Sequence, residues 1–294
     1  MKSGYVAVIG RANAGKSTLV NVIVGEKIAI VSPKPQTTRD RICGVYNGDD
    51  CQIVFVDTPG LYKADNMLNS VMQRTAETSA EDVDLILFVT DAHDGLTEKD
   101  ISLIQKYTSL GIPAIAVLTK TDIMPESLLL SELKQLSDIT ADIVPVSARR
   151  GKNIAELVKV IKEKLPENDK IFGDDVISDR SEKFMISEIM REKLLLRFDK
   201  EIPHGVAIIV NRFKLREDGK IYDIYLDIVC ERQNHKAILI GKGGRALKEA
   251  SSFARADMEK FLGKKVFLTT YVRVEENWRN SARLIKAHGY SEED

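Results

Sequence analysis

A short run near the N-terminus has the residue types and spacing needed to hold a phosphate group. It reads Gly10-Arg-Ala-Asn-Ala-Gly15-Lys16-Ser17, with four residues between two glycines and then Lys-Ser. Glycines let the backbone N–H groups curl around a phosphate, Lys16 can reach the β- and γ-phosphates, and the Ser17 hydroxyl can bind Mg²⁺. A glycine-rich turn that matches by chance is the alternative. The flanks favour the functional interpretation, because residues 5–9 read as a buried strand and residues 17–25 as a helix ended by a glycine.

Two later motifs offer further groups for a phosphate and its metal ion. The polar loop around Thr37 and Thr38 carries hydroxyls that can close over a γ-phosphate and Mg²⁺, although a solvated loop is the simpler interpretation of that segment alone. Asp57-Thr58-Pro59-Gly60 follows an apolar run, and a carboxylate there can hold Mg²⁺ through water while the Gly60 N–H contacts the γ-phosphate.

Two more motifs have the chemistry to recognise a base. In Thr119-Lys120-Thr121-Asp122, the carboxylate can accept two hydrogen bonds from the N1 and N2 edge of guanine, a donor pair that adenine lacks. In Ser147-Ala148-Arg149, a backbone N–H can reach guanine O6. Each motif is weak evidence alone, whereas five in this order predict one guanine nucleotide site.

The elements that must position these motifs alternate between strand and helix. Apolar runs recur at residues 53–56, 85–89, 114–118 and 143–146, with helix-length segments such as 99–110 and 126–137 between the later ones. This pattern predicts an α/β fold with a mainly parallel sheet and helices on both faces. The motifs fall at the carboxyl ends of strands, where such sheets bind ligands. Residues 42–46 and 52–56 read as a hairpin around Asn47-Gly48.

The second half has a different order of elements. A helix over 153–165 ends at Pro166, and the polar residues 167–179 read as a boundary. The pattern then predicts a helix over 181–197, strands over 205–213 and 221–229, helices over 235–240 and 245–261, and a strand over 265–274. We interpret Trp278 as an anchor for a last helix.

The two helices in the middle of this half are joined by Gly241-Lys242-Gly243-Gly244. Glycines without side chains let a single-stranded RNA backbone lie close to the helix ends, while Lys242, Arg245 and Lys248 supply cations and Ile240 an apolar surface for bases. The alternative is a helix–loop–helix joint whose glycines serve only the turn. Charge favours RNA, since residues 1–180 carry a net −5 and residues 181–294 a net +4.

Composition fits a soluble globular chain long enough for two domains. Of its 294 residues, 44% are hydrophobic and 30% charged, and no apolar run approaches the about 18 residues of a membrane span. The N-terminus shows no signal segment, and Cys43, Cys51 and Cys230 lack C-x-x-C spacing, which predicts reduced thiols in a cytoplasmic protein. The four histidines are scattered, so we expect no zinc site.

The five motifs of the first half resemble those of translation-factor-related GTPases. Thr37-Thr38-Arg39 with Asp57-Thr58-Pro59-Gly60 is similar to the branch that contains the Era and TrmE families. This resemblance implies a P-loop GTPase domain that hydrolyses GTP to GDP, with catalytic roles for Asn13, Lys16, Thr38, Asp57 and Gly60, and Mg²⁺ bound by Ser17, Thr38 and Asp57. The implied nucleotide contacts are Gly10, Arg11, Ala12, Asn13, Ala14, Gly15, Lys16, Ser17, Thr18, Thr37, Thr38, Asp57, Thr58, Pro59, Gly60, Leu61, Thr119, Lys120, Thr121, Asp122, Ser147, Ala148 and Arg149.

Two positions depart from related patterns. The fourth motif of the family is Asn-Lys-x-Asp, and Thr119 stands in place of the Asn that ties the base to the phosphate loop. Guanine specificity through Asp122 is expected to survive with a change in affinity. Leu61 occupies the position of the water-orienting Gln of Ras-like enzymes and cannot polarise water. In TrmE-type enzymes an Asn at the position of Asn13 binds K⁺, so the resemblance implies potassium-stimulated hydrolysis.

The second half resembles a type II KH domain, an α+β fold, in its order of elements and its Gly-x-x-Gly loop. A GTPase domain over 1–166, a linker over 167–180 and a KH domain with a C-terminal helix over 181–294 form the arrangement of the Era family of bacterial ribosome-assembly GTPases. The resemblance implies binding by residues 240–245 and Lys248 to 16S ribosomal RNA near its 3′ end, a role in 30S subunit assembly, a monomeric state, and a cytoplasmic location with peripheral association at the inner membrane. A protein-signalling switch that grips a protein partner is the alternative, although single-domain Ras-like switches lack the Gly-x-x-Gly module.

Overall fold

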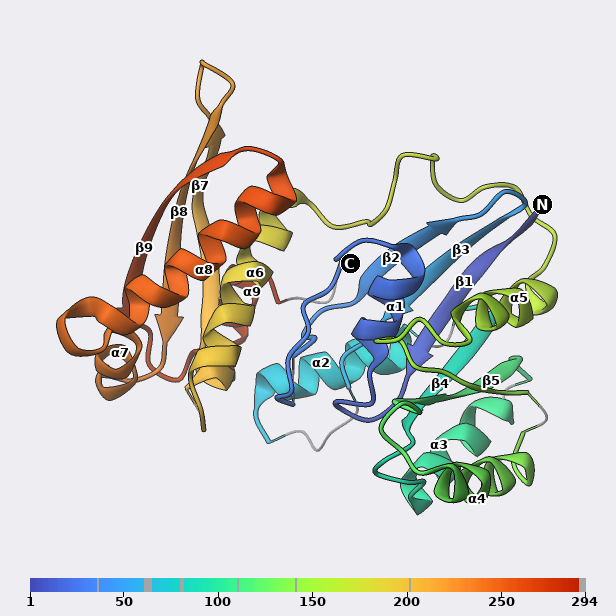
Figure 1. Cartoon of the computed structure of the whole chain (residues 1–294). Coiled ribbons are helices and arrows are strands. Elements are labelled where there is room, and N and C mark those ends of the chain that lie inside the picture. The colour runs from blue at the N-terminus through green and yellow to red at the C-terminus, as the bar shows by residue number, and fades with distance from the viewer. Residues whose placement is uncertain are drawn as a thin grey trace. The chain divides into compact units, whose positions relative to one another are not determined.

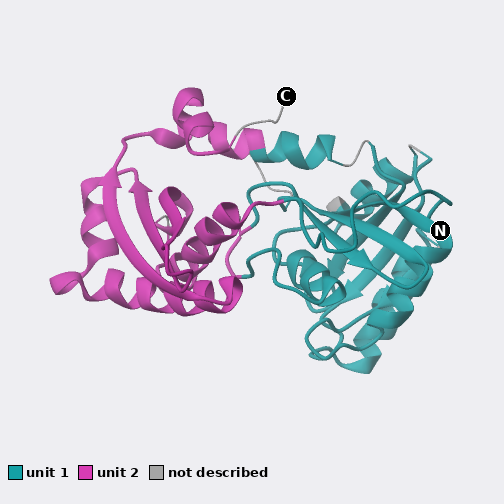
Figure 2. Ribbon diagram, turned by 90° about the horizontal axis from the view of Figure 1, so that it is seen from above, with its two compact units in different colours: residues 1–31, 38–63, 72–179 teal, residues 32–37, 64–71, 180–294 magenta. Residues whose placement is uncertain are grey.

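The computed structural model describes residues 1–35, 37–60, 65–79, 82–109, 111–140, 142–200 and 202–290, with Lys99 described by its backbone alone. The chain forms two compact units. Unit 1 comprises residues 1–31, 38–63 and 72–179, and unit 2 comprises residues 32–37, 64–71 and 180–294 (Figure 2). Each unit has its own sheet and its own hydrophobic core.

Unit 1 is built on a six-stranded sheet of order β2-β3-β1-β4-β5-β6. Its strands are β1 (Lys2–Ile9), β2 (Ile42–Asn47), β3 (Cys51–Asp57), β4 (Leu85–Asp91), β5 (Ala114–Thr119) and β6 (Ile143–Pro145). Only the β2–β3 hairpin is antiparallel among these pairs. The prediction of a mainly parallel sheet is therefore confirmed, and every residue of β3 and β4 is buried, as expected of strands covered on both faces.

Helices cover both faces of this sheet (Figure 1). They are α1 (Lys16–Val24), α2 (Met67–Thr78), α3 (Glu98–Thr108), α4 (Glu126–Ser137) and α5 (Ile154–Lys164), and the residues of α2 divide between the two units. α3 begins with a capping box in which Thr97 and Asp100 exchange hydrogen bonds. Ile104 of α3 and Leu136 of α4 pack on Phe88 and Leu118, which fixes the strand ends that carry the base-recognition motifs.

The residues that the sequence marks as a boundary, 167–179, belong to unit 1 and pack against its sheet. The Gln52 side chain donates to the Phe172 carbonyl (2.9 Å) and accepts from the backbone N–H groups of Ile171 (2.8 Å) and Phe172 (2.9 Å). Further along, Val45 N–H donates to the Ile177 carbonyl, and Cys43 N–H donates to the Asp179 carboxylate. This segment therefore covers β2, which is an edge strand of the sheet.

Unit 2 has a three-stranded sheet of order β7-β8-β9. Its main elements are α6 (Glu182–Arg197), β7 (Ala207–Leu215), β8 (Ile221–Cys230), α7 (Gln233–Ile240), α8 (Arg245–Leu262), β9 (Lys265–Val274) and α9 (Ala282–Ala287). β7 pairs antiparallel with β8, and β8 pairs parallel with β9. The predicted order α-β-β-α-α-β is confirmed.

One face of this sheet forms the core of unit 2. Ile224, Leu226 and Ile228 of β8 pack with Ile189 of α6 and Ala254 of α8, among other buried apolar residues. Figure 1 shows α6 and α8 lying across the strands. Trp278 is fully buried and donates its indole N–H to the Gly205 carbonyl (3.0 Å). Its ring also contacts those of His288 and Tyr290, which directly follow α9, so its prediction as an anchor for the last helix is confirmed.

None of the described helices is both long enough and apolar enough to cross a bilayer.

Candidate functional site

The phosphate loop of unit 1 joins β1 to α1 and lies against the third motif. A Cβ added at Gly60 would come within 2.9 Å of Ala12 Cα, so only glycine allows this close approach of the two backbones. Thr58, two residues before Gly60, donates its hydroxyl to the Val8 carbonyl of β1 (3.0 Å). Pro59, which lies between Thr58 and Gly60 in the sequence, is buried. The motif that follows β3 is thereby fixed beside the loop that follows β1.

Three oxygen-bearing side chains meet where the sequence predicts a magnesium site. The Ser17 hydroxyl donates to the Asp57 carboxylate (2.6 Å) and lies 3.0 Å from the Thr38 hydroxyl. Ser17 opens α1, Asp57 ends β3, and Thr38 precedes β2, so three separate elements supply one cluster. Hydroxyl and carboxylate oxygens are the hard donors that Mg²⁺ takes in phosphate sites, and the residues present fit that ion.

Lys16 and Asp57 form a buried pair of opposite charges beside this cluster. Burial lowers the pKa of Lys16 to about 8, an effect that the negative charge of Asp57 partly offsets. Burial raises the pKa of Asp57, against the opposing effect of Lys16 and the hydroxyls of Ser17 and Thr38. The Lys16 ammonium donates to the carbonyls of Gly10 and Arg11 (3.0 Å each), which holds it inside the loop that it serves.

The fourth motif is tied to the phosphate loop through Thr119. Its hydroxyl oxygen lies 2.6 Å from the Ala14 carbonyl and 3.0 Å from the Thr90 carbonyl, and its one proton serves the nearer oxygen. Lys120 has a positive φ of 59° and pairs with Asp91 at the end of β4. The link to the phosphate loop that an Asn makes in the family motif is thus made here by the shorter side chain of Thr119.

The fourth and fifth motifs are joined directly. The Ser147 hydroxyl donates to the Asp122 carboxylate (2.6 Å), and this hydrogen bond lowers the pKa of Asp122 below its usual value. The backbone N–H of Thr121 donates to the Val146 carbonyl. Asp122 is therefore held in its ionised form, which can accept hydrogen bonds from the N1 and N2 edge of a guanine base.

A pocket lies between these motifs and the start of α1. It is lined by predicted residues from three motifs and by one residue that was not predicted: Gly15, Thr18, Thr119, Lys120, Asp122, Ala148, Arg149 and Ile123. Sequence reasoning did not assign Ile123, nor the role of Asp91 in pairing with Lys120. Ile123 could have been predicted from its position, because it is a large apolar residue that directly follows Asp122 in a turn that is otherwise polar.

Three other predicted residues lie apart from this cluster or carry different contacts. The Arg11 side chain turns toward α3, donating to the Gly95 carbonyl (2.7 Å) and pairing with Asp100 (3.1 Å). The Thr37 hydroxyl donates to the Lys34 carbonyl (2.7 Å) within the short segment grouped with unit 2. Asn13 is exposed in the loop with a φ of 63°. Leu61 lies outside the described residues.

Unit 2 carries a groove beside the predicted RNA-binding loop. The groove is lined by Gly244, Leu247, Lys248, Ser251, Ser252 and Arg255 along α8, and by Leu268 and Thr270 of β9. The predicted residues Lys242, Gly243 and Arg245 are exposed at the start of α8, and Ile240 packs against the core. Leu247, Ser251 and Arg255 were missed, although their spacing of four residues after Gly243 places them on one helix face.

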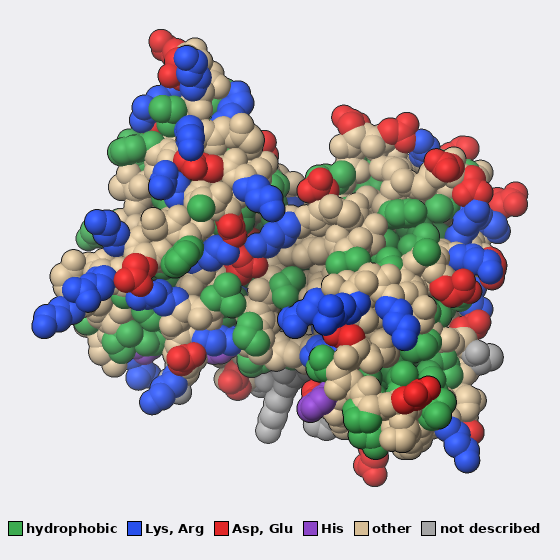
Figure 3. All heavy atoms as spheres, viewed as in Figure 1, with side chains coloured by type: hydrophobic (Ala, Val, Ile, Leu, Met, Phe, Trp, Pro, Cys, Tyr) green, Lys and Arg blue, Asp and Glu red, His purple; other side chains and the backbone are tan. Residues whose placement is uncertain are grey.

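The glycines of this loop have conformations that other residues rarely adopt. Gly241, Gly243 and Gly244 have φ values of 73°, 61° and 75°. A Cβ at Gly241 would also lie 2.6 Å from Ala246 Cβ, whereas one at Gly244 would meet open space. Basic side chains stand out on the surface around α7 and the start of α8 (Figure 3). The backbone of this loop and its basic side chains are therefore both accessible to a ligand from solvent.

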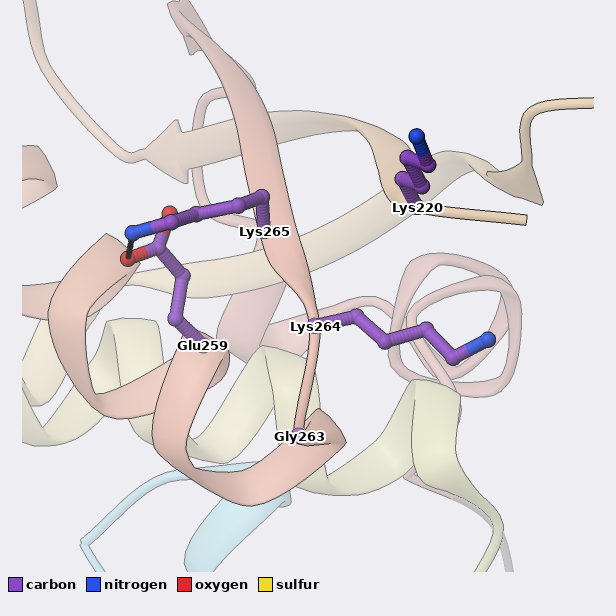
Figure 4. A pocket seen from close by; sticks show the side chains of 5 residues that line it. All are labelled: Lys220, Glu259, Gly263, Lys264 and Lys265. Carbon is purple, nitrogen blue, oxygen red and sulfur yellow. Dashed lines mark ion pairs between the residues drawn. The ribbon is translucent and has the colours of Figure 1, made fainter. Parts of the chain in front are cut away.

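A second, shallower pocket lies at the other end of α8. Lys220, Glu259, Gly263, Lys264 and Lys265 line it (Figure 4). Lys265 pairs with Glu259 (3.6 Å), Lys264 donates to the Gly219 carbonyl (2.9 Å), and Lys220 points away. These three cations do not converge on one point.

Comparison with known proteins gives the same two parts in the same order. A family model described as a 50S ribosome-binding GTPase matches residues 5–120, and a KH domain model matches residues 201–279. The chain is 45% identical over 294 residues to GTPase Era of Clostridioides difficile and 44% identical over 292 residues to that of Clostridium kluyveri, covering 99% of both chains in each case.

Solved structures agree over the same length. A variant of Aquifex aeolicus Era bound to GDP and aluminium fluoride is similar with a TM-score of 0.95 and 37% identity, covering 99% of this chain and 100% of that one. An Era in complex with MgGDPNP and nucleotides 1506–1542 of 16S ribosomal RNA is similar with a TM-score of 0.95 and 38% identity, with the same coverage. On this identity over nearly its whole length, the chain belongs to the Era family of GTPases.

Proposed function

We propose that this protein hydrolyses GTP in unit 1 and binds the 3′ end of 16S ribosomal RNA through unit 2, and that it thereby assists assembly of the 30S subunit. The observation that carries the first half is the meeting of Ser17, Thr38 and Asp57 beside Lys16. Phosphoryl transfer needs positioning and charge stabilisation more than covalent chemistry, and this cluster offers both.

Each residue of the cluster has a distinct task in this proposal. Ser17 and Thr38 would hold Mg²⁺ through their hydroxyls, and the Asp57 carboxylate beside them would hold it through water. When bound, that ion neutralises charge on the β- and γ-phosphates. Lys16 contributes a positive charge to the same phosphates, and the Gly60 backbone N–H lies where the third motif meets the phosphate loop.

The base pocket supports guanine as the nucleotide. We expect Asp122→Asn to shift preference from GTP toward xanthosine triphosphate, because the amide offers one donor where guanine N2 needs an acceptor and xanthine presents a carbonyl. Competition binding of GTP, ATP and xanthosine triphosphate to both forms tests this. Asp138→Asn, at the C-terminal end of α4, is the control and should leave the order of preference unchanged. ATP binding as tight as GTP binding in the wild type would exclude recognition of guanine by Asp122.

The groove along α8 and β9 supports RNA as the second ligand. KH domains hold single-stranded RNA with a glycine-containing loop, cations and a partly apolar groove. The relative solved with nucleotides 1506–1542 of 16S ribosomal RNA suggests which strand it is. Binding of that segment, against a scrambled strand at the same salt concentration, tests the assignment. A protein-signalling role would be indicated if neither strand bound.

Potassium is the proposed substitute for an arginine finger. Asn13 lies exposed in the phosphate loop, and its carbonyl oxygen is a suitable ligand for a monovalent cation. We expect hydrolysis to be faster in KCl than in NaCl at equal ionic strength, and Asn13→Ala to remove this difference while GDP affinity stays nearly the same. Equal rates in the two salts for the wild type would reject this role and direct attention to Arg39 or to an external activator.

The family also leads us to propose a monomer that works in the cytoplasm and touches the inner face of the membrane only peripherally. Sedimentation of the purified protein tests the first part. Release from membranes by high salt, without detergent, tests the second.

A further inference from the structure

The face of the unit 2 sheet that α6 and α8 leave uncovered carries three exposed aromatic rings. Tyr271 is 61% exposed, Phe267 is 51% exposed and Tyr225 is 36% exposed. Phe267, Thr269 and Tyr271 of β9 point to one face, because they alternate with residues such as the buried Val266 and Val272. Tyr225 of β8 is paired with Thr269 and therefore lies on the same face. We call these three rings the aromatic row.

Each ring of the row has a cation beside it. The Arg212 guanidinium lies 5.3 Å from the centre of the Tyr225 ring, and that of Arg216 lies 5.5 Å from the centre of the Phe267 ring. The Lys236 ammonium, from α7, lies 5.2 Å from the centre of the Tyr271 ring. Bases stack on aromatic rings, and cations beside those rings can contact the phosphates that join the bases.

The charges on this face are arranged so that the positive ones reach solvent. Asp223 pairs with Arg212 and Arg216, and Arg273 pairs with Asp227 and Glu275. The three carboxylates are only 14% to 20% exposed, whereas the three guanidinium side chains are between 38% and 46% exposed. The face therefore complements a polyanion that also has flat apolar surfaces.

β9 connects this face to the groove described above. Its Leu268 and Thr270 line the groove, while the alternate residues Phe267 and Tyr271 belong to the aromatic row. A strand of RNA leaving the groove at β9, which is an edge strand, needs only to pass round that edge to reach the rings. Tyr225 of β8 lies level with Thr269 of β9, so along the strand direction it is two residues, a rise of about 6.6 Å, from both Phe267 and Tyr271.

We propose that the aromatic row is a second binding surface for single-stranded RNA, continuous with the groove and stacking bases on Tyr225, Phe267 and Tyr271. The proposal rests on the proposed RNA-binding function of unit 2. RNA is favoured over a protein partner because the exposed apolar groups of the row are all aromatic and each is accompanied by a cation.

The test uses the full chain and two RNA probes from the 3′ end of 16S ribosomal RNA at one salt concentration. One has about 6 nucleotides, enough for a KH groove, and the other has about 20, enough to continue round the edge. We expect the double substitution Phe267→Ala and Tyr271→Ala to weaken binding of the long probe about tenfold or more, and that of the short probe less than about twofold. Tyr271→Phe, which keeps the ring, should retain wild-type affinity for both.

Two further variants separate this proposal from the one on which it rests. Phe253→Ala removes a ring that is 64% exposed on α8, outside the row, and should change neither affinity. Gly244→Asp should abolish binding of the short probe; if it does not, the groove assignment fails. If the groove variant behaves as expected but the double substitution leaves the long probe unchanged, or weakens both probes equally, the aromatic row is not an RNA surface.

Discussion

Thr119 is the residue at which this chain departs most clearly from the fourth motif of its family. Its hydroxyl can donate to only one of the two carbonyls, those of Ala14 and Thr90, that lie within reach. An Asn amide has two N–H donors. We expect Thr119→Asn to tighten GDP binding several-fold, because one further hydrogen bond contributes on the order of 1 kcal/mol to holding the loop in place.

Titration calorimetry of GDP into both forms measures this change. Thr78→Asn, an exposed site at the end of α2, makes the same exchange of side chains far from the motif and should leave affinity unchanged. Unaltered or weaker binding by Thr119→Asn would mean that the larger amide does not fit the buried position.

Lys16 makes nucleotide binding depend on pH. Its pKa of about 8 lies below the ordinary value of 10.5, so between these values the unfolded chain binds more protons at this position than the folded one. Stability from this group therefore rises with pH over that range. Nucleotide affinity should move the opposite way, because a neutral amine no longer attracts phosphate, with a loss of up to about tenfold per pH unit above pH 8.

Affinity for GDP measured from pH 6.5 to 9.5 at constant ionic strength would show this as a plateau followed by a decline. Calorimetry at pH 8 in buffers of different ionisation enthalpy should detect an uptake of about half a proton on binding. A level profile up to pH 9.5 would show that the ammonium keeps its charge throughout the range.

Among the elements, the loop between α7 and α8 permits the sharpest test, because its two outer glycines differ in their surroundings. Gly241 is crowded by Ala246, whereas Gly244 faces open space. We expect Gly244→Asp to reduce RNA affinity at least about tenfold through bulk and negative charge beside the phosphates, with little effect on GTP hydrolysis.

Gly219→Asp is the matched control. Gly219 also has a positive φ, of 67°, and also faces open space, but it lies in the β7–β8 turn away from the groove. It should carry a similar backbone strain and leave RNA affinity near that of the wild type. Equal losses for both variants would attribute the effect to strain or net charge instead of the loop.

Most elements could be predicted from the sequence because their apolar periodicity matches their burial. β3 and β4 read as unbroken apolar runs and are buried throughout, and α8 follows the predicted range of 245–261 to within one residue. α2 was not predicted. Asn66 caps its start, because the Asn69 backbone N–H donates to the Asn66 side chain (2.9 Å), but one Asn alone does not mark a helix. Its buried residues, among them Leu68 and Met72, find their partners only in the fold.

The site could be predicted where a motif is local and not where it depends on packing. The residues of the phosphate loop are consecutive, so their spacing alone identifies them. The pairing of Lys120 with Asp91 and the inclusion of Ile123 in the base pocket depend on how β4, β5 and the following turns lie together. The orientation of Arg11 toward Asp100 likewise depends on α3, which no local pattern places beside the loop.

At the scale of the whole molecule, the segment over 167–179 should behave as part of the GTPase unit. A fragment ending at residue 166 lacks the hydrogen bonds to Gln52, Val45 and Cys43, so it exposes the β2 edge. After the entropy of ordering the segment is subtracted, we expect a net loss of about 1–2 kcal/mol and a Tm lower by roughly 5 °C than that of a fragment ending at residue 179.

Thermal unfolding of the two fragments measures the difference, and Gln52→Ala identifies its source. In the longer fragment this substitution removes the side chain that holds Ile171 and Phe172, so its Tm should fall toward that of the shorter fragment. In the shorter fragment, which lacks Ile171 and Phe172, the same substitution should lower the Tm by less. Identical Tm values for the two unsubstituted fragments would show that the segment contributes no stability.

The covering of β2 also has a consequence for synthesis on the ribosome. Chains emerge from the N-terminus, so all six strands of the first sheet leave the ribosome before the residues that pair with its edge. Until residue 179 has emerged, a row of backbone N–H and C=O groups on β2 is open to pairing with another nascent chain. A pause in translation just before that point should therefore favour aggregation, and a pause just after it should not.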